Sequence, residues 1–149
     1  KNETVRFEGR APKAGTYVGP TIVELRDAGT LDREVFGPVL HVVRWKGEQL
    51  DQVIDAINAT GYGLTLGVHS RIDETIDRIA ARVKVGNVYV NRNQIGAVVG
   101  VQPFGGQGLS GTGPKAGGPH YLPRFATEKT VTVNTTAAGG NASLLTLGD

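Results

Sequence analysis

A carboxylate and an aromatic ring stand two residues apart in the segment Glu34-Val-Phe36-Gly37-Pro38. On an extended chain, residues at positions i and i+2 project to the same side. The carboxylate of Glu34 could accept hydrogen bonds from two ribose hydroxyls, and the ring of Phe36 could pack on a flat heterocycle, as nucleotide binding requires. The same pattern also fits a charged residue at the end of a strand beside a core Phe, and the spacing alone favours this structural interpretation.

Small residues and a second aromatic residue follow in a glycine-rich segment further along the chain. The backbone N–H groups of Gly96 and Ala97 could approach an anionic ligand closely, because neither residue has a bulky side chain. Phe104, within Pro103-Phe-Gly-Gly106, could form a wall beside the aliphatic part of such a ligand. A tight turn with a buried Phe explains the same residues, and it is the favoured interpretation from the residues alone.

Other motifs do not indicate a catalytic or metal site. The segment Gly106-Gln-Gly-Leu-Ser-Gly111 matches the dinucleotide fingerprint, but the Pro- and Gly-rich residues 112–119 cannot form the helix that this fingerprint needs. The three His residues are far apart, the sequence has no Cys, and Ser110 lacks a nucleophile elbow. We therefore predict neither a metal site nor a catalytic nucleophile in this chain.

Composition is that of an ordinary globular protein. Of the 149 residues, 39% are hydrophobic and 20% are charged, and the formal net charge is +2. The basic residues are scattered, so nucleic-acid binding is not expected, and no apolar run approaches the roughly 20 residues of a membrane span. The chain opens without a signal peptide, so we expect a cytoplasmic protein. It also opens without Met, which fits a processed N-terminus or, as we expect, a piece of a longer chain.

Apolar periodicity predicts alternating strands and helices. Two segments repeat apolar residues at i, i+3, i+4 and i+7, as amphipathic helices do, and the run at 39–45 suits a sheet covered on both faces. The predicted elements are strand Thr21–Glu24, strand Val39–Trp45, helix Glu48–Ala59, strand Leu64–His69, helix Asp73–Lys84, strand Val88–Asn91 and strand Thr127–Asn134. This order predicts an α/β fold with a mainly parallel sheet and crossover helices. Residues 94–119 are predicted to form a long glycine-rich loop, and loops of this length in a compact domain are usually functional.

Four motifs, in this order and spacing, resemble the C-terminal part of aldehyde dehydrogenases. They are Glu34-Val-Phe-Gly-Pro-Val39, Tyr62-Gly-Leu64, Gly86-Asn-Val-Tyr-Val-Asn91 and Pro103-Phe-Gly-Gly-Gln-Gly-Leu-Ser-Gly111. Residues 91–106, 110–112 and 117–121 are similar to the L-glutamate γ-semialdehyde (Δ1-pyrroline-5-carboxylate) dehydrogenase branch of that superfamily. Residues 127–141 resemble the bacterial proline utilization A proteins, in which that dehydrogenase is fused to a flavin-dependent proline dehydrogenase.

The resemblance implies a role for each matching residue. Glu34 would hold the ribose hydroxyls beside the nicotinamide of NAD, and Phe36 would pack beside the nicotinamide ring. Gly96 and Ala97 would donate backbone N–H groups to the carboxylate of the substrate, and Phe104 would line the aliphatic chain of the semialdehyde.

The resemblance also implies a partial enzyme. It divides the chain into part of an aldehyde dehydrogenase catalytic domain (1–126), an oligomerisation strand (127–134) that would join subunits into a homo-oligomer, and a C-terminal tail (135–149). The family's nucleophile is a Cys, and this sequence has none, so we expect the chain alone to be inactive. Its parent would oxidise L-glutamate γ-semialdehyde to glutamate with NAD, while FAD would serve only a fused proline dehydrogenase domain outside this chain. Two alternatives are an aldehyde dehydrogenase for another substrate and a non-catalytic assembly module.

Overall fold

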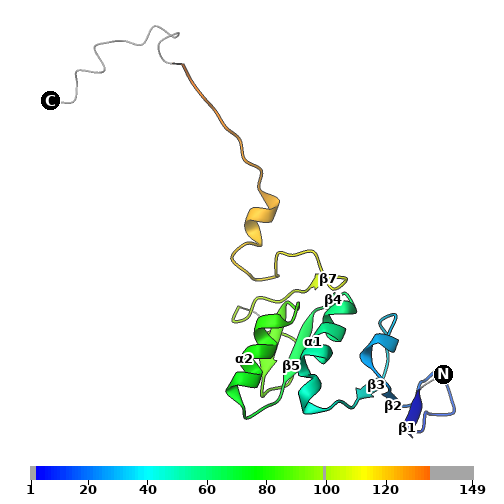
Figure 1. The fold of residues 1–149 in the computed structure, drawn as a ribbon. Helices are drawn as coiled ribbons and strands as arrows, with labels where there is room; N and C mark the ends of the chain where they lie inside the picture. Colours follow the sequence, from blue (N-terminus) through cyan, green and yellow to red (C-terminus); the bar gives the residue numbers. More distant parts are fainter. Residues whose placement is uncertain (1–2, 99, 135–149) are drawn as a thin grey trace, which may run out of the picture.

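The computed structural model describes residues 3–98 and 100–134, and the strands of this part form three small sheets (Figure 1). The first sheet contains β1 (Thr4–Glu8), β2 (Thr21–Leu25) and β3 (Val39–Val43), in that order. β2 and β3 are parallel, whereas β1 is antiparallel to β2. The strands expected at 21–24 and 39–45 are therefore confirmed, and β1 is an addition that the sequence patterns did not predict.

Two helices and two parallel strands follow the first sheet. The 3-10 turn η2 (Gly47–Gln49) leads into α1 (Leu50–Ala59), and β5 (Thr65–Val68), α2 (Asp73–Arg82) and β6 (Asn87–Val90) come next. β5 and β6 are parallel, and α2 connects them as a crossover helix. Both predicted helices and the strands expected at 64–69 and 88–91 are confirmed, with small shifts at their ends.

The core is small, and its most buried residues come from four different elements. Ile54 of α1 is 1% exposed, and Leu25, Val68 and Tyr89 are also buried. α1 contacts both the 3-10 turn η1 (Ala28–Thr30) and the short strand β4 (Tyr62–Gly63). The apolar stripe of α1 thus packs toward the core, as its periodicity predicts.

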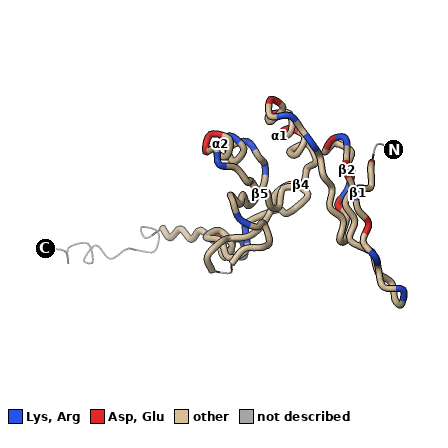
Figure 2. Tube along the Cα trace, turned by 90° about the horizontal axis from the view of Figure 1, so that it is seen from below, with Lys and Arg blue, Asp and Glu red and all other residues tan. Residues whose placement is uncertain are grey.

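Charged residues are spread along the elements, and acidic and basic positions occur near one another on the backbone trace (Figure 2). Arg78 of α2 pairs with Asp51 of α1 at 2.5 Å between Nη2 and Oδ2, and Arg82 pairs with Asp55 at 2.8 Å. In the first sheet, the Arg6 guanidinium donates a hydrogen bond to Glu24, and this bond lowers the pKa of the Glu24 carboxyl. These pairs link neighbouring elements, which agrees with the diffuse charge of the sequence.

The glycine-rich segment contains more regular pairing than a loop. β7 (Gln107–Gly108) pairs antiparallel with β4, and an isolated antiparallel bridge joins Phe104 to Ala116. The segment also approaches other backbone very closely, because a Cβ atom added at Gly86 would lie 1.7 Å from the carbonyl oxygen of Gly105. Glycine is required at Gly86 to let the two backbones meet.

The α/β class is confirmed, but two details of the expected sheet are wrong. The parallel strands do not form one sheet: β2–β3 and β5–β6 are parallel pairs in different sheets of the described residues. β3 is also not covered on both faces, since the side chain of Leu40 is 56% exposed. Among the described residues, no helix is long and apolar enough to cross a membrane.

The segment 127–134 does not form the expected strand. It belongs to no strand of the described part of the chain, and it runs away from the other elements beyond η3 (Leu122–Phe125) (Figure 1). A strand forms only where a neighbouring strand supplies hydrogen bonds, and alternation along one segment does not provide that neighbour. The tail assigned to 135–149 lies outside the described residues.

Candidate functional site

Glu34 and Phe36 line one side of a cavity of about 620 Å³ beside β4. The backbone N–H of Glu34 donates a hydrogen bond to the hydroxyl of Tyr62, with 3.4 Å between nitrogen and oxygen. After this contact the chain turns at Gly37, whose φ of +142° favours glycine, and enters β3. Tyr62 and the turn therefore fix where the segment enters the cavity.

The side chains of this segment remain available for a ligand. Phe36 is 89% exposed, so the buried core Phe of the alternative interpretation is not present in this chain. The Glu34 side chain is also exposed, and within residues 3–98 and 100–134 its carboxylate has no hydrogen bond or ion pair. A free carboxylate next to an exposed ring can accept hydroxyl hydrogen bonds while the ring stacks on a planar group.

Gly96 and Ala97 lie in a loop that begins where β6 ends. Asn91 has a φ of +53°, and its side chain exchanges two hydrogen bonds with the backbone of Ser70, at 3.0 and 2.9 Å. These bonds join the ends of the parallel strands β5 and β6, from which the loop departs. The hydrogen bonds to Ser70 therefore hold Asn91, the residue at which the loop begins.

Inside the loop, local hydrogen bonds leave two backbone donors unused. Ile95 N–H donates to the side chain of Asn93 at 3.4 Å, and the Gly96 carbonyl accepts from the Tyr89 hydroxyl at 3.2 Å. The N–H groups of Gly96 and Ala97 make no hydrogen bond within the described part of the chain. Two adjacent free N–H groups form the kind of concavity that binds an anion.

Phe104 is held at the opposite end of β6. Its backbone exchanges hydrogen bonds with Ala116, with N···O distances of 3.0 and 2.9 Å. The side chain of Asn87, the first residue of β6, donates to the Pro103 carbonyl at 3.0 Å and accepts from the Gly105 N–H at 3.5 Å. The Phe104 side chain is half-buried, so one part of its ring is available to a ligand.

The structure arranges the five predicted residues in two groups. Glu34 and Phe36 belong to the cavity beside β4, whereas Gly96, Ala97 and Phe104 are tied to β6. The two groups are connected through backbone, because the N–H of Gly86 donates to the Gly63 carbonyl at 3.0 Å and the N–H of Asn87 donates to the Leu64 carbonyl at 3.1 Å. β4 and β6 thus provide a common frame for both groups.

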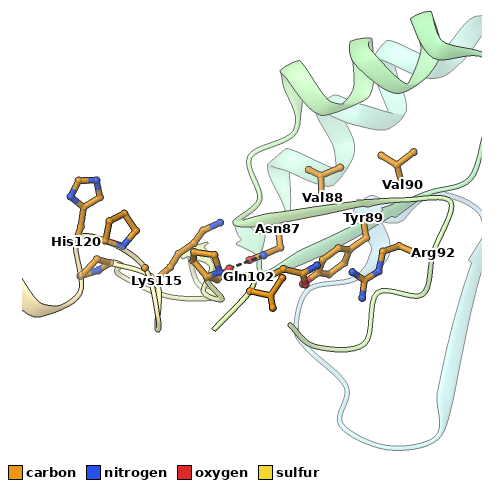
Figure 3. A pocket seen from close by; sticks show the side chains of 13 residues that line it. Asn87, Val88, Tyr89, Val90, Arg92, Gln102, Lys115 and His120 are labelled. Carbon is orange, nitrogen blue, oxygen red and sulfur yellow. Dashed lines mark hydrogen bonds between the residues drawn. The ribbon is translucent and has the colours of Figure 1, made fainter. Parts of the chain in front are cut away.

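A second cavity, of about 700 Å³, lies along β6 (Figure 3). Asn87 and Tyr89 point into this cavity from one face of the strand, and Val88 and Val90 project from the opposite face, as residues two apart on a strand do. None of the five predicted residues lines the cavity. The cavity is relevant because Asn87 and Tyr89, whose side chains bind the backbone of the predicted loop 94–119, lie on the same face of β6.

Two motifs that the sequence reasoning set aside have structural roles. The hydroxyl of Ser110 accepts a hydrogen bond from the Gly63 N–H at 3.0 Å, which fixes the turn against β4. The fingerprint-like residues 106–111 contain β7, and residues 112–119 after them form no helix. The expectation that residues 112–119 form no helix is therefore confirmed.

Sequence reasoning missed three residues that hold the site together: Tyr62, Asn87 and Tyr89. All three occur in motifs that carry the family resemblance, and that was the only signal for them. Their partners, Glu34, Pro103 and Gly96, lie between 7 and 28 residues away along the chain. Contacts at this range cannot be read from a local pattern.

Comparison with known proteins identifies the family. Residues 1–131 match the family model described as "Aldehyde dehydrogenase family". The chain belongs to this family. The match covers most of the sequence and includes all five predicted site residues.

Relatives within the family are more specific. The chain is 66% identical over 113 residues to the bifunctional protein PutA of Rhizobium meliloti, which covers 76% of this chain and 9% of that protein. It superimposes on proline utilization A (PutA) from Bradyrhizobium japonicum with a TM-score of 0.84 and 68% identity, over 91% of this chain and 14% of that one. A 1-pyrroline-5-carboxylate dehydrogenase from Thermus with bound NAD gives a TM-score of 0.74 and 39% identity, over 83% of this chain and 24% of that one.

These likenesses confirm the predicted branch of the family. They also show that the chain matches only a part of each relative. The chain spans about a tenth of the Rhizobium protein and about a quarter of the Thermus enzyme. The activity of a whole dehydrogenase therefore involves far more chain than the 149 residues described by this sequence.

Proposed function

We propose that this chain is part of an NAD-dependent dehydrogenase that oxidises L-glutamate γ-semialdehyde to L-glutamate. The observation that carries the proposal is the pair of unused N–H groups at Gly96 and Ala97, in a loop held at both strands of the β5–β6 pair. A pair of backbone donors suits a carboxylate, and the semialdehyde carries one. The names of the relatives, proline utilization A and 1-pyrroline-5-carboxylate dehydrogenase, support the same substrate.

The overall reaction balances with water and one cofactor. The aldehyde, water and NAD⁺ give the carboxylate, NADH and two protons. Hydride acceptance is the chemistry that NAD supplies when bound. The thiolate nucleophile of this reaction class must come from outside this sequence, because the sequence has no Cys.

The residues beside β4 fit the nicotinamide half of NAD. Glu34 has an exposed carboxylate without a partner in the described part of the chain, and it can accept both ribose hydroxyls. Phe36 is 89% exposed and presents a flat apolar surface. The Tyr62 hydroxyl holds the backbone of Glu34, so the carboxylate projects from a fixed position. We assign orientation of the cofactor to this group.

The residues tied to β6 fit the substrate. Gly96 and Ala97 would bind its carboxylate through their N–H groups, and Phe104 would contact the methylene groups between the carboxylate and the aldehyde. The hydrogen bonds of Phe104 to Ala116 fix the backbone at that position. We assign orientation of the substrate to this second group.

Assembly and location are part of the same proposal. Residues 127–134 would pair with a strand of another subunit, because Val131 and Val133 are 72% and 70% exposed and polar and apolar residues alternate along the segment. FAD would be used only by a fused proline dehydrogenase domain outside this chain. The enzyme would act in the cytoplasm, where NAD is available.

The proposal is tested with the full-length protein that carries this segment. NADH formation is measured with L-glutamate γ-semialdehyde, with glutarate semialdehyde, which keeps the carboxylate but lacks the amine, and with pentanal, which lacks both. We expect kcat/KM to be at least about tenfold higher for both carboxylated aldehydes than for pentanal, as loss of a charged hydrogen-bond partner implies. Equal values for the three aldehydes, or no NADH from any carboxylated one, would contradict the proposal.

A further inference from the structure

Tyr89 lies at the centre of the substrate group without being one of its predicted ligands. It is the third residue of β6 and only 5% exposed. Its hydroxyl donates a hydrogen bond to the carbonyl oxygen of Gly96, with 3.2 Å between the oxygens. A buried tyrosine normally finds a partner for its hydroxyl. Here the partner belongs to the loop that presents the unused N–H groups.

The hydrogen bond acts directly on one of those donors. The carbonyl of Gly96 and the N–H of Ala97 are the two ends of the same peptide group, and this peptide is trans. In a planar trans peptide, the carbonyl oxygen and the amide hydrogen point in opposite directions. A carbonyl held toward β6 therefore turns the Ala97 N–H away from the strand. The same hydrogen bond polarises the peptide group and makes that N–H a better donor.

This loop needs an external restraint. Gly96 has a φ of +60°, and no atom beyond its chain neighbours would lie within 4 Å of a Cβ at this position, so packing does not fix its conformation. Glycine can adopt conformations with positive or negative φ at little cost. A rotation of the Gly96–Ala97 peptide would turn the Ala97 N–H toward β6. The Tyr89 hydroxyl is the side-chain group in the described residues that opposes this rotation.

The ring of Tyr89 is itself held in place. The guanidinium carbon of Arg92 lies 4.6 Å from the centre of the ring, a cation–π contact that Figure 3 shows beside the strand. The Arg92 Nε also donates to the carbonyl of Asn93 at 3.2 Å, which ties this cation to the start of the loop. The contact with Arg92 thus holds the Tyr89 ring in the position from which its hydroxyl reaches the Gly96 carbonyl.

We infer that Tyr89 is a positioning residue for the carboxylate end of the substrate, acting through the Gly96–Ala97 peptide. The inference rests on the proposed function, since it takes the Ala97 N–H as a ligand of that carboxylate. It adds a specificity role for a buried side chain that does not touch the substrate. Aldehydes without a carboxylate do not use the donor, so Tyr89 affects them little.

The test is Tyr89→Phe in the full-length protein, which removes the hydroxyl and keeps the ring. We expect KM for glutarate semialdehyde to rise about fivefold with kcat little changed, because a net hydrogen-bond contribution of ordinary size is lost. KM for pentanal should stay the same. Tyr17→Phe is the matched control, since Tyr17 is 61% exposed and its hydroxyl has no bond in the described residues. A merely structural role would lower kcat equally for both aldehydes and leave the ratio of KM values unchanged, which would overturn the inference.

A second variant keeps the test decisive if Tyr89→Phe does not fold. Arg92→Met removes the cation from the ring face and leaves the hydroxyl in place. A ring that is no longer held would weaken the hydrogen bond from the Tyr89 hydroxyl to Gly96. We therefore expect KM for glutarate semialdehyde to rise about two- to threefold and KM for pentanal to stay the same. An unchanged ratio of the two KM values would contradict the inference. If the wild-type protein does not prefer carboxylated aldehydes, the proposed function fails; if it does and both variants keep that preference, only the role of Tyr89 fails.

Discussion

At the scale of single residues, the proposed site consists of predicted ligands and of the tyrosines that contact their backbone. Tyr62 holds the backbone of Glu34, and Tyr89 holds the carbonyl of Gly96. In both cases the hydroxyl contacts backbone rather than another side chain. Glu34 and Gly96 thus project from backbone positions that neighbouring strands contact, which is how a rigid scaffold orients groups on loops.

Replacement of Glu34 tests the cofactor group. Glu34→Gln keeps the size of the side chain but removes its charge, so the two ribose hydroxyls lose a charged acceptor. We expect KM for NAD in the full-length protein to rise about tenfold, the value of one charge-assisted hydrogen bond. KM for the aldehyde should change much less.

The control for this prediction is Glu8→Gln, at an exposed position of β1 away from the cavity. It should leave both KM values unchanged. An unaltered KM for NAD in Glu34→Gln would remove Glu34 from the cofactor group. A general loss of activity in both variants would indicate instability rather than lost binding.

Sequence reasoning predicts candidate ligands more easily than the residues that would position them. Glu34, Phe36, Gly96, Ala97 and Phe104 stand in motifs whose residue types indicate a chemistry. A tyrosine in an apolar strand, such as Tyr89 in β6, is typical of core packing, and nothing local points to its hydroxyl. Its partner is set by the path of the loop, so the contact becomes visible only in three dimensions.

At the scale of elements, apolar periodicity predicted the helices and strands that local sequence determines. α1 and α2 carry apolar stripes, and β2, β3, β5 and β6 are β-branched or apolar runs, so these elements were predicted close to their observed bounds. β4 and β7 contain two residues each and exist because they pair with one another. Thr127–Asn134 is the opposite case, because its alternation is clear but it belongs to no strand of the described chain.

The contact between Gly86 and Gly105 tests how the glycine-rich segment is held. In Gly86→Ala the added Cβ would lie 1.7 Å from the Gly105 carbonyl oxygen, so the backbone must move. We expect a loss of about 1–3 kcal/mol of stability, the usual cost of overpacking, measured as a lower midpoint temperature of thermal inactivation of the full-length protein.

Gly47→Ala is the control for this substitution. Gly47 begins η2, and a Cβ there would meet no atom within 4 Å. The midpoint should stay within about 2 °C of the wild type, because surface substitutions of this kind have small effects. A midpoint equally unchanged in Gly86→Ala would show that the close approach of the two backbones is not needed.

At the scale of the whole molecule, the described chain leaves much apolar surface uncovered. Phe7, Val18 and Leu40 of the N-terminal part are all more than half exposed. Apolar surface of this extent normally marks contact with other protein. The relatives are about three to eight times longer than this chain, so in those proteins further chain is available to cover such a surface.

Assembly through residues 127–134 is tested by charge on the apolar side of the segment. Val131 and Val133 stand two residues apart and face the same way on an extended chain, so the double variant Val131→Asp, Val133→Asp places two like charges on that side. We expect the full-length protein to shift to a smaller oligomer by light scattering at equal concentration. Thr132→Asp, on the opposite side, should keep the wild-type mass. The same mass for all three proteins would contradict a role of this segment in assembly.

The most direct test of the account is the aldehyde selectivity of Ala97→Phe in the full-length protein. The bulky ring would block approach of a carboxylate to the N–H pair, so we predict that kcat/KM falls at least about tenfold more for glutarate semialdehyde than for pentanal. Ala81→Phe, at an exposed position of α2, should change neither value. Equal losses on the two aldehydes in Ala97→Phe would contradict the claim that this loop binds the carboxylate of the substrate.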